Sequence, residues 1–192
     1  MRYEIRLSGM GGQGLLLAGI IVAEAAMAQG KNVVQTASYG PESRGGASRS
    51  EVIISEKAID YPAVIEADYL FAMTQEATDK FFYEVKPHGI ALLDSTWVKE
   101  IPAGNVESTY YFPLTETAIE KFEKAIFANI IGLGIICESS KIVEPDYLIA
   151  ALLDRVPKRY KEMNQVAFET GIELFTNGKI TKGVAGQAVK TV

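Results

Sequence analysis

The sequence contains a single cysteine and a single histidine, and this scarcity removes several classes of site. Iron–sulfur clusters and structural zinc need several cysteine or histidine ligands, which Cys137 and His88 cannot supply. Cys137 ends an apolar stretch, which predicts a small buried side chain. His88 lies in a Lys-Pro-His-Gly turn signature and is expected to be exposed. We therefore expect neither a metal site nor a histidine-based catalytic triad.

Long hydrophobic runs and clusters of positive charge are also missing. The longest apolar run, residues 15–28, contains Glu24 and is shorter than the roughly 20 residues that a membrane-spanning helix needs. Lys and Arg are scattered along a chain of formal net charge −5. Neither nucleic acid nor an anionic membrane is therefore an expected partner. The first residues lack the pattern of a secretory signal, which predicts a cytoplasmic protein.

The sequence does contain a regular alternation of apolar segments. Its 192 residues, of which 48% are hydrophobic, suffice for one sizeable core. No linker or repeat divides them, so we expect a single domain over residues 1–192, with 177–192 as a loosely structured tail. Strands are expected at residues 3–8, 31–36, 51–55, 68–73, 89–94 and, with a weaker pattern, 105–112.

Helices are expected between these strands and after them. They cover residues 13–29, 75–85 and 115–137, a short helix opening at Glu144-Pro145-Asp146, and a last helix with Tyr160, Met163, Ala167, Gly171 and Leu174 on one face. Gly132 and Gly134 are expected to interrupt or soften the region 115–137 and to permit close packing. This order predicts an α/β, Rossmann-like fold with a mainly parallel open sheet and helices on both faces.

A glycine-rich loop separates the first expected strand from the first expected helix. It reads Gly9-Met10-Gly11-Gly12-Gln13-Gly14 and fits GxGxxG, in which glycines let backbone N–H groups approach phosphate oxygens. The following helix offers further unpaired N–H groups and the positive end of its dipole. We therefore expect a phosphate, carboxylate or pyrophosphate at Gly9, Gly11, Gly12, Gln13 and Gly14. The alternative is that these glycines only let strand and helix pack closely.

Two residues that would specify this ligand further are missing. The dinucleotide fingerprint places an acid about 20 residues later, at the end of the second strand. The sequence there reads Val34-Gln35-Thr36-Ala37-Ser38. The lysine of a P-loop is missing as well. The loop thus predicts an anion site without favouring NAD binding or ATP hydrolysis.

A second loop, residues 38–50, carries two arginines and three glycines between two expected strands. Arg44 and Arg49 can present forked donors to a carboxylate or phosphate, and Gly45 and Gly46 leave room for it beside Ser43. Loops at the carboxyl ends of neighbouring strands converge, so we expect this segment beside the first loop. The equally weighted alternative is an interface loop, in which Arg44 pairs with a carboxylate of another subunit and Tyr39 packs across the contact.

Together the two loops resemble the γ subunit of 2-oxoacid:ferredoxin oxidoreductases. The resemblance extends through residues 47–55, the strand that begins at Ala67-Asp68, and the Ala128-Asn129 helix with its Leu133-Gly134, so it covers most of the chain. Within that family, the segment Tyr39-Gly40-Pro41-Glu42-Ser43-Arg44-Gly45-Gly46 is more similar to the 2-oxoglutarate enzymes than to the pyruvate enzymes.

The resemblance implies a multisubunit enzyme that converts 2-oxoglutarate, coenzyme A and oxidised ferredoxin into succinyl-CoA, carbon dioxide and reduced ferredoxin. It assigns thiamine diphosphate and iron–sulfur clusters to partner α and β subunits, with a ferredoxin-like δ subunit as a further candidate partner. This chain would have no catalytic residue and no certain cofactor of its own, and would meet ferredoxin only indirectly. Its role would be subunit contacts and part of a coenzyme A or anion site. Alone, it is expected to be inactive and to self-associate.

Two other functions stay open at this point. One is the small subunit of an indolepyruvate:ferredoxin oxidoreductase, which has the same architecture and acts on aryl pyruvates. The other is a free-standing nucleotide-binding module. The missing ribose-binding acid and the second arginine loop argue against this last function.

Overall fold

The computed structural model describes residues 1–38, 47–104 and 106–177. Their strands form one six-stranded sheet in the order β2-β3-β1-β4-β5-β6. The strands are β1 (Arg2–Gly9), β2 (Asn32–Ser38), β3 (Ser48–Ser55), β4 (Ala67–Ala72), β5 (Val85–Asp94) and β6 (Ser108–Phe112). The helices are α1 (Leu15–Ala28), α2 (Gln75–Phe81), α3 (Leu114–Phe122), α4 (Ala128–Ser140), α5 (Pro145–Arg155) and α6 (Lys161–Asn177).

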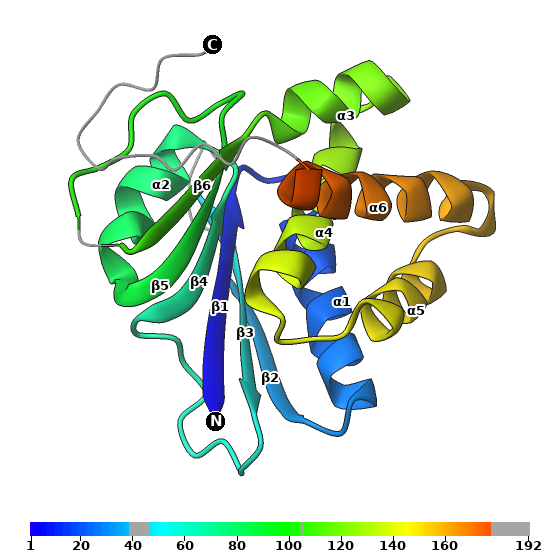
Figure 1. The fold of residues 1–192 in the computed structure, drawn as a ribbon. Coiled ribbons are helices and arrows are strands. Elements are labelled where there is room, and N and C mark those ends of the chain that lie inside the picture. The colour runs from blue at the N-terminus through cyan, green and yellow to red at the C-terminus, as the bar shows by residue number, and fades with distance from the viewer. Residues whose placement is uncertain (39–46, 105, 178–192) are drawn as a thin grey trace.

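The helices form unequal layers on the two faces of the sheet. Figure 1 shows α1, α4, α5 and α6 together on one face and α2 on the other. Helix α1 is apolar nearly all round because it lies between the sheet and α5, and Ala18, Ile21 and Ala25 are fully buried. The α/β architecture with helices on both faces is thus confirmed. Among the described helices, none combines the length and apolar character that crossing a membrane would require.

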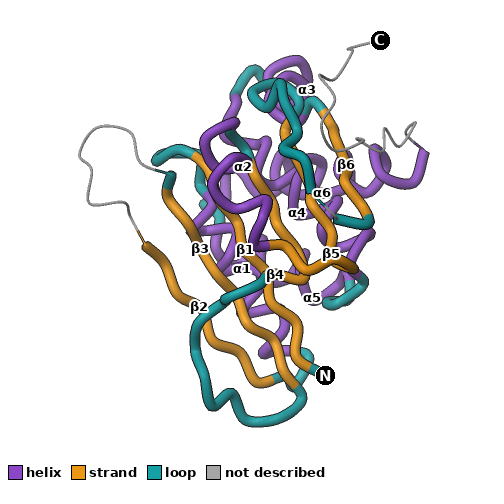
Figure 2. The backbone as a smooth tube through the Cα atoms, turned by 90° about the vertical axis from the view of Figure 1, so that its left-hand side faces the viewer, coloured by secondary structure: helices purple, strands orange, loops and turns teal. Residues whose placement is uncertain are grey.

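The directions of the strands determine which strand ends lie next to the glycine loop that follows β1. β1, β4, β5 and β6 are parallel to one another, whereas β3 is antiparallel to both of its neighbours, β1 and β2. The sheet is therefore mainly parallel, as expected, with one reversed strand inserted beside β1. Figure 2 shows β2 at the outer edge of this sheet. The carboxyl end of β1 consequently has the start of β3 on one side and the end of β4 on the other.

The helical region expected at 115–137 breaks earlier than the glycines suggested. Helix α3 ends at Phe122 because Glu123 adopts a left-handed backbone conformation with φ 58°, and α4 begins at Ala128. Gly132 and Gly134 lie inside α4 without interrupting it. A Cβ atom at Gly132 would clash with the Phe71 ring, so the expectation of close packing at these glycines is confirmed.

Candidate functional site

The glycine loop has a backbone path that only glycine follows easily. Gly12 has φ 91° and Gly14 has φ 74°, both in the left-handed region that side chains disfavour. Gly11 opens to free space, since a Cβ atom there would meet nothing within 4 Å. Gly14 precedes α1 and provides no side-chain cap for it. The first N–H groups of α1 are therefore available to an anion at this end of the helix.

Two carboxamide side chains brace the loop from inside. The Gln13 Oε1 atom accepts a hydrogen bond from the Met10 N–H at 2.7 Å, and it fills the space where Gly9 would carry a Cβ atom. The Asn129 Nδ2 atom, at the start of α4, donates to the Gly14 carbonyl oxygen at 3.1 Å. Gln13, expected to contact ligand, thus holds the loop in shape. The loop pattern itself gives no signal for Asn129, which lies 115 residues away.

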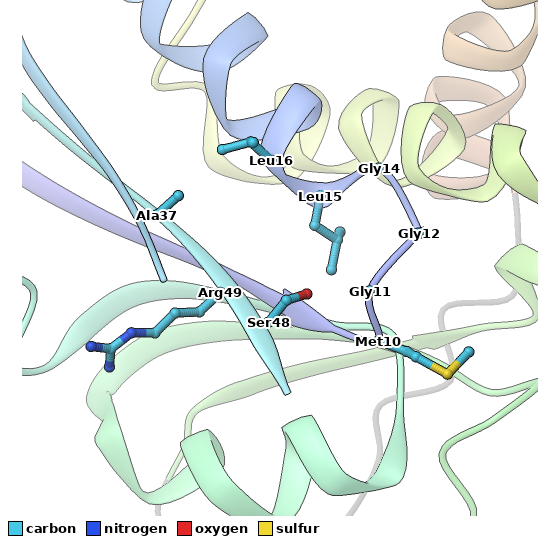
Figure 3. A pocket seen from close by; sticks show the side chains of 9 residues that line it. All are labelled: Met10, Gly11, Gly12, Gly14, Leu15, Leu16, Ala37, Ser48 and Arg49. Carbon is cyan, nitrogen blue, oxygen red and sulfur yellow. The ribbon is translucent and has the colours of Figure 1, made fainter. Parts of the chain in front are cut away.

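A hollow of about 210 Å³ lies between the glycine loop and the ends of β2 and β3. Figure 3 shows its lining, which includes Gly11, Gly12, the first residues of α1, and Ser48. Ser48 lies opposite Gly9 in the antiparallel register, and its hydroxyl donates to the Gly9 carbonyl oxygen at 3.0 Å. This register places the end of the second loop beside the first, as expected from the sequence.

Of the two arginines in the second loop, Arg49 belongs to the described residues. Arg49 lines the hollow, but its guanidinium group points away from the glycine loop in Figure 3. The cause is strand alternation, because Ser50 contacts α1 at Gly19 and its neighbour Arg49 must face the other side of the sheet. Arg44 lies outside the described residues. So do the other positions on which the two readings of this loop rest, Tyr39, Ser43, Gly45 and Gly46.

A larger crevice of about 490 Å³ lies on the β4 side of the glycine loop. Its lining comes from the segments that follow β1, β4, β5 and β6, together with Ala125 and Ile126. Met10, Gly12 and Gln13 follow β1, and Thr74, Gln75 and Glu76 follow β4. Trp97 follows β5, and Thr115 follows β6. Helix α1 leaves β1 on one face and α2 leaves β4 on the other, and this divergence is where open α/β sheets bind ligands. No sequence motif marks this crevice.

Asp94, at the end of β5, supports the wall of the crevice. Its carboxylate accepts hydrogen bonds from the Thr96 and Thr115 N–H groups at 3.1 and 3.2 Å. Burial raises the pKa of Asp94 above its usual range, against the opposing effect of these bonds. The Thr115 hydroxyl donates to the same carboxylate at 2.5 Å. Because Asp94 is fully buried and binds these groups on both sides, it orders the start of α3 and the turn before Trp97.

The charges around the loop suit binding more than acid–base chemistry. Among the described residues, Arg49 is the one charged side chain that lines the smaller hollow, and Glu76 is the one that lines the crevice. Cys137 is buried and His88 is exposed, as expected. Within residues 1–38, 47–104 and 106–177, no three His, Cys, Asp or Glu side chains gather in an arrangement that could hold a metal ion.

Comparison with known proteins gives full-length matches. A family model described as pyruvate ferredoxin/flavodoxin oxidoreductase matches residues 4–174. The 2-oxoglutarate synthase subunit KorC of Methanocaldococcus jannaschii is 46% identical over 176 residues, which cover 91% of this chain and 94% of the relative. The indolepyruvate oxidoreductase subunit IorB of Methanothermobacter thermautotrophicus is 28% identical, over 89% of this chain and 96% of the relative.

A solved structure is similar over the same extent. The γ subunit of a keto/oxoacid ferredoxin oxidoreductase from Geobacter sulfurreducens superposes with a TM-score of 0.85 at 45% identity. The match covers 93% of this chain and 98% of that subunit. The family match over residues 4–174 includes the residues of the glycine loop and those that line the crevice.

Proposed function

The chain belongs to the pyruvate ferredoxin/flavodoxin oxidoreductase family, and we propose that it is the γ subunit of a 2-oxoglutarate:ferredoxin oxidoreductase. It is a subunit of a 2-oxoacid:ferredoxin oxidoreductase complex, of EC 1.2.7 type. The observation that carries the choice of 2-oxoglutarate is the full-length match to KorC at 46% identity, against 28% for the indolepyruvate subunit.

The complex would convert 2-oxoglutarate, coenzyme A and oxidised ferredoxin into succinyl-CoA, carbon dioxide and reduced ferredoxin in the cytoplasm. We assign thiamine diphosphate and the iron–sulfur clusters to α and β partners, with the ferredoxin-like δ subunit as a further one. The single cysteine of this chain does not fit a cluster, because Cys137 is buried in α4 and burial raises the pKa of its thiol to about 11. A cluster ligand must be a thiolate.

The contribution of this chain to that reaction would be to bind an anion and to form subunit contacts. Coenzyme A carries phosphate groups, and the glycine loop presents the uncapped start of α1 beside the open surface of Gly11 and Gly12. Gln13 and Asn129 would hold the loop ready for the anion. The second loop would add Arg44 or Arg49 either to this site or to a subunit interface.

The experiment is anaerobic affinity purification of this chain with its partners from its native cells. The recovered complex is assayed for coenzyme A-dependent reduction of ferredoxin or viologen, with 2-oxoglutarate and indolepyruvate compared at equal concentration. We expect turnover with 2-oxoglutarate and none from the isolated chain. Turnover with indolepyruvate alone would replace the substrate assignment, and recovery of a lone, inactive chain would overturn the subunit function itself.

A further inference from the structure

A third pocket lies within the helical layer on the face of the sheet that carries α1, α4, α5 and α6 (Figure 1). It has a volume of about 310 Å³ and lies between the first turn of α1, the start of α4, and the segment that joins α5 to α6. It meets the glycine loop at Gly14 alone, and the Gly14 carbonyl oxygen is bound there by Asn129. We call this space the helical-layer pocket.

Most of the lining of the helical-layer pocket is apolar. Phe127, Ile130 and Val156 line it and are buried, and Ile126 lines it while 47% exposed. Because one water molecule occupies ~30 Å³ of the liquid, the pocket has room for roughly ten waters or for one large side chain. An apolar side chain that replaced this water would bind favourably.

The rim of the pocket is positively charged, although the chain has a formal net charge of −5. Lys124 lines the pocket, and its Nζ atom lies 5.0 Å from the centre of the Tyr160 ring. The Cζ atom of Arg159 lies 4.7 Å from the same centre. The ion pairs of the described residues include neither these two cations nor the nearby Glu123 and Glu162. Both charges can therefore pair with a carboxylate from outside.

This combination is typical of a protein interface. An apolar centre inside a polar rim is the usual anatomy of such a surface, and Tyr and Arg are enriched in it. Small ligands of open α/β sheets bind instead at the carboxyl ends of the strands. The chain is also a subunit of a 2-oxoacid:ferredoxin oxidoreductase complex, so it has partner polypeptides. The positive rim requires that the segment bound there be acidic.

We propose that the helical-layer pocket receives a segment of a partner subunit that carries a large apolar side chain next to Asp or Glu. The apolar side chain fills the pocket, and the carboxylate pairs with Lys124 and Arg159 at its rim. The inference rests on the proposed function, because a free-standing chain has no such partner.

Chemical labelling of Lys124 tests this contact. The anaerobically purified complex and the isolated full chain are each treated with a limiting amount of an acetylating reagent, and each lysine is quantified by mass spectrometry. We expect Lys124, which is exposed in the isolated chain, to react several-fold more slowly in the complex. Equal reaction in the two samples would overturn the proposal.

Cross-linking identifies the chemistry of the bound segment. A carbodiimide joins a lysine amine to a carboxylate in contact with it, so it should link Lys124 to Asp or Glu of a partner subunit. Protection of Lys124 without such a link would overturn the acidic segment. A link between two copies of this chain would overturn the partner subunit as the occupant.

Charge reversal measures the strength of the contact. Lys124→Glu should leave the melting temperature of the isolated chain unchanged and weaken its binding to the purified partner subunits about fivefold. Replacing the cross-linked carboxylate of the partner by lysine should restore the binding. Lys80→Glu is the matched control, because Lys80 is also exposed and lies 5.4 Å from the centre of the Phe81 ring, but on α2. Equal losses in the two variants would contradict the assignment of Lys124.

The same samples separate this inference from the proposed function. A complex that is active with 2-oxoglutarate but leaves Lys124 unprotected would overturn the docking surface alone. A complex that shows the cross-link but turns over only indolepyruvate would support the surface and overturn the substrate assignment. Recovery of a lone chain would overturn the subunit function and this surface with it.

Discussion

Asn129 shows how one buried side chain can be tied to a binding loop. Its side chain is 2% exposed, and its Nδ2 atom holds the Gly14 carbonyl oxygen. Its Oδ1 atom is buried and has no partner among the described residues. An unpaired buried acceptor costs on the order of 1–3 kcal/mol. A residue that served packing alone would avoid this cost, so its contribution lies in the shape of the glycine loop.

Asn129→Leu keeps the volume of the side chain and removes both the hydrogen bond to Gly14 and the unpaired acceptor. We expect an unchanged or higher melting temperature, and an affinity for coenzyme A that falls roughly fivefold, or about 1 kcal/mol. In the assembled enzyme this appears as a raised KM for coenzyme A at constant kcat.

Asn164→Leu is the matched control for this substitution. Asn164 is also buried, but its Nδ2 atom donates to the Tyr160 carbonyl oxygen one turn earlier in the chain. It should leave the KM for coenzyme A unchanged. A destabilised Asn129→Leu protein with normal KM would show that Asn129 acts only on folding.

Cys137 should make the protein sensitive to alkali. Burial raises the pKa of its thiol to about 11, so between about pH 9 and 11 the folded chain keeps a proton that the unfolded chain loses. Proton loss from the unfolded state lowers the unfolding free energy as pH rises through this range. Burial also raises the pKa of Tyr69, which acts in the same direction.

Urea denaturation at a series of pH values from about 8 to 11 measures this effect. The decrease should be smaller in Cys137→Val, which lacks the titrating thiol and keeps an apolar side chain. The native thiol should also resist labelling by a disulfide reagent near pH 8 and react only after unfolding. Rapid labelling of the folded chain would contradict the buried position of Cys137.

At the scale of elements, α4 and α6 cross with almost no side chain between them. A Cβ atom at Gly171 would clash with the Ile131 carbonyl oxygen, and one at Gly134 with the Phe168 carbonyl oxygen. Neither obstacle is the flexible end of a side chain, so the helices would have to separate. This contact anchors α4, and α4 in turn carries Asn129 to the glycine loop.

Gly171→Ala should therefore lower the unfolding free energy by about 1–3 kcal/mol, the range seen for overpacked cores. Gly11→Ala is the matched control, since its Cβ atom would enter open space and its φ is not in the left-handed region. It should change stability by no more than about 0.5 kcal/mol. Chemical denaturation of both variants measures the two unfolding free energies. An equal decrease in both variants would contradict the packing argument.

The sequence indicates most of these elements but not how they meet. Apolar segments and the glycines after β1 suffice to predict the α/β alternation and a glycine loop at the start of α1, while the anion site at this loop stays a prediction. Periodicity carries no information on strand direction, so the reversal of β3 could not be predicted. The end of α3 depends on the left-handed conformation of Glu123, a residue that does not favour it. The crevice could not be predicted from the sequence, because each strand end contributes only a few residues and these form no recognisable motif.

On the scale of the whole molecule, the two ends of the sheet have different surfaces. The carboxyl ends of β1 and β4 carry the glycine loop and the crevice. At the opposite end of the sheet, on the face that carries α2, the buried Arg6 donates to the Val64 carbonyl oxygen at 2.9 Å and pairs with Glu84. Arg6 thereby links the segment before β4 to the segment before β5. Each of them exposes a large apolar side chain, Ile65 at 65% and Tyr83 at 67%.

Large exposed apolar side chains on segments joined in this way are unfavourable in water unless another surface covers them. We expect the isolated chain to self-associate as its concentration rises, measured by light scattering, and the double variant Ile65→Lys, Tyr83→Lys to remain closer to monomeric. Met27→Lys is the matched control, because Met27 is 61% exposed at the far end of α1. If partner subunits cover the same surface, their addition should displace the self-associated form of the wild type and bind the double variant more weakly. A wild-type chain that stays monomeric at every concentration would show that neither side chain needs a partner.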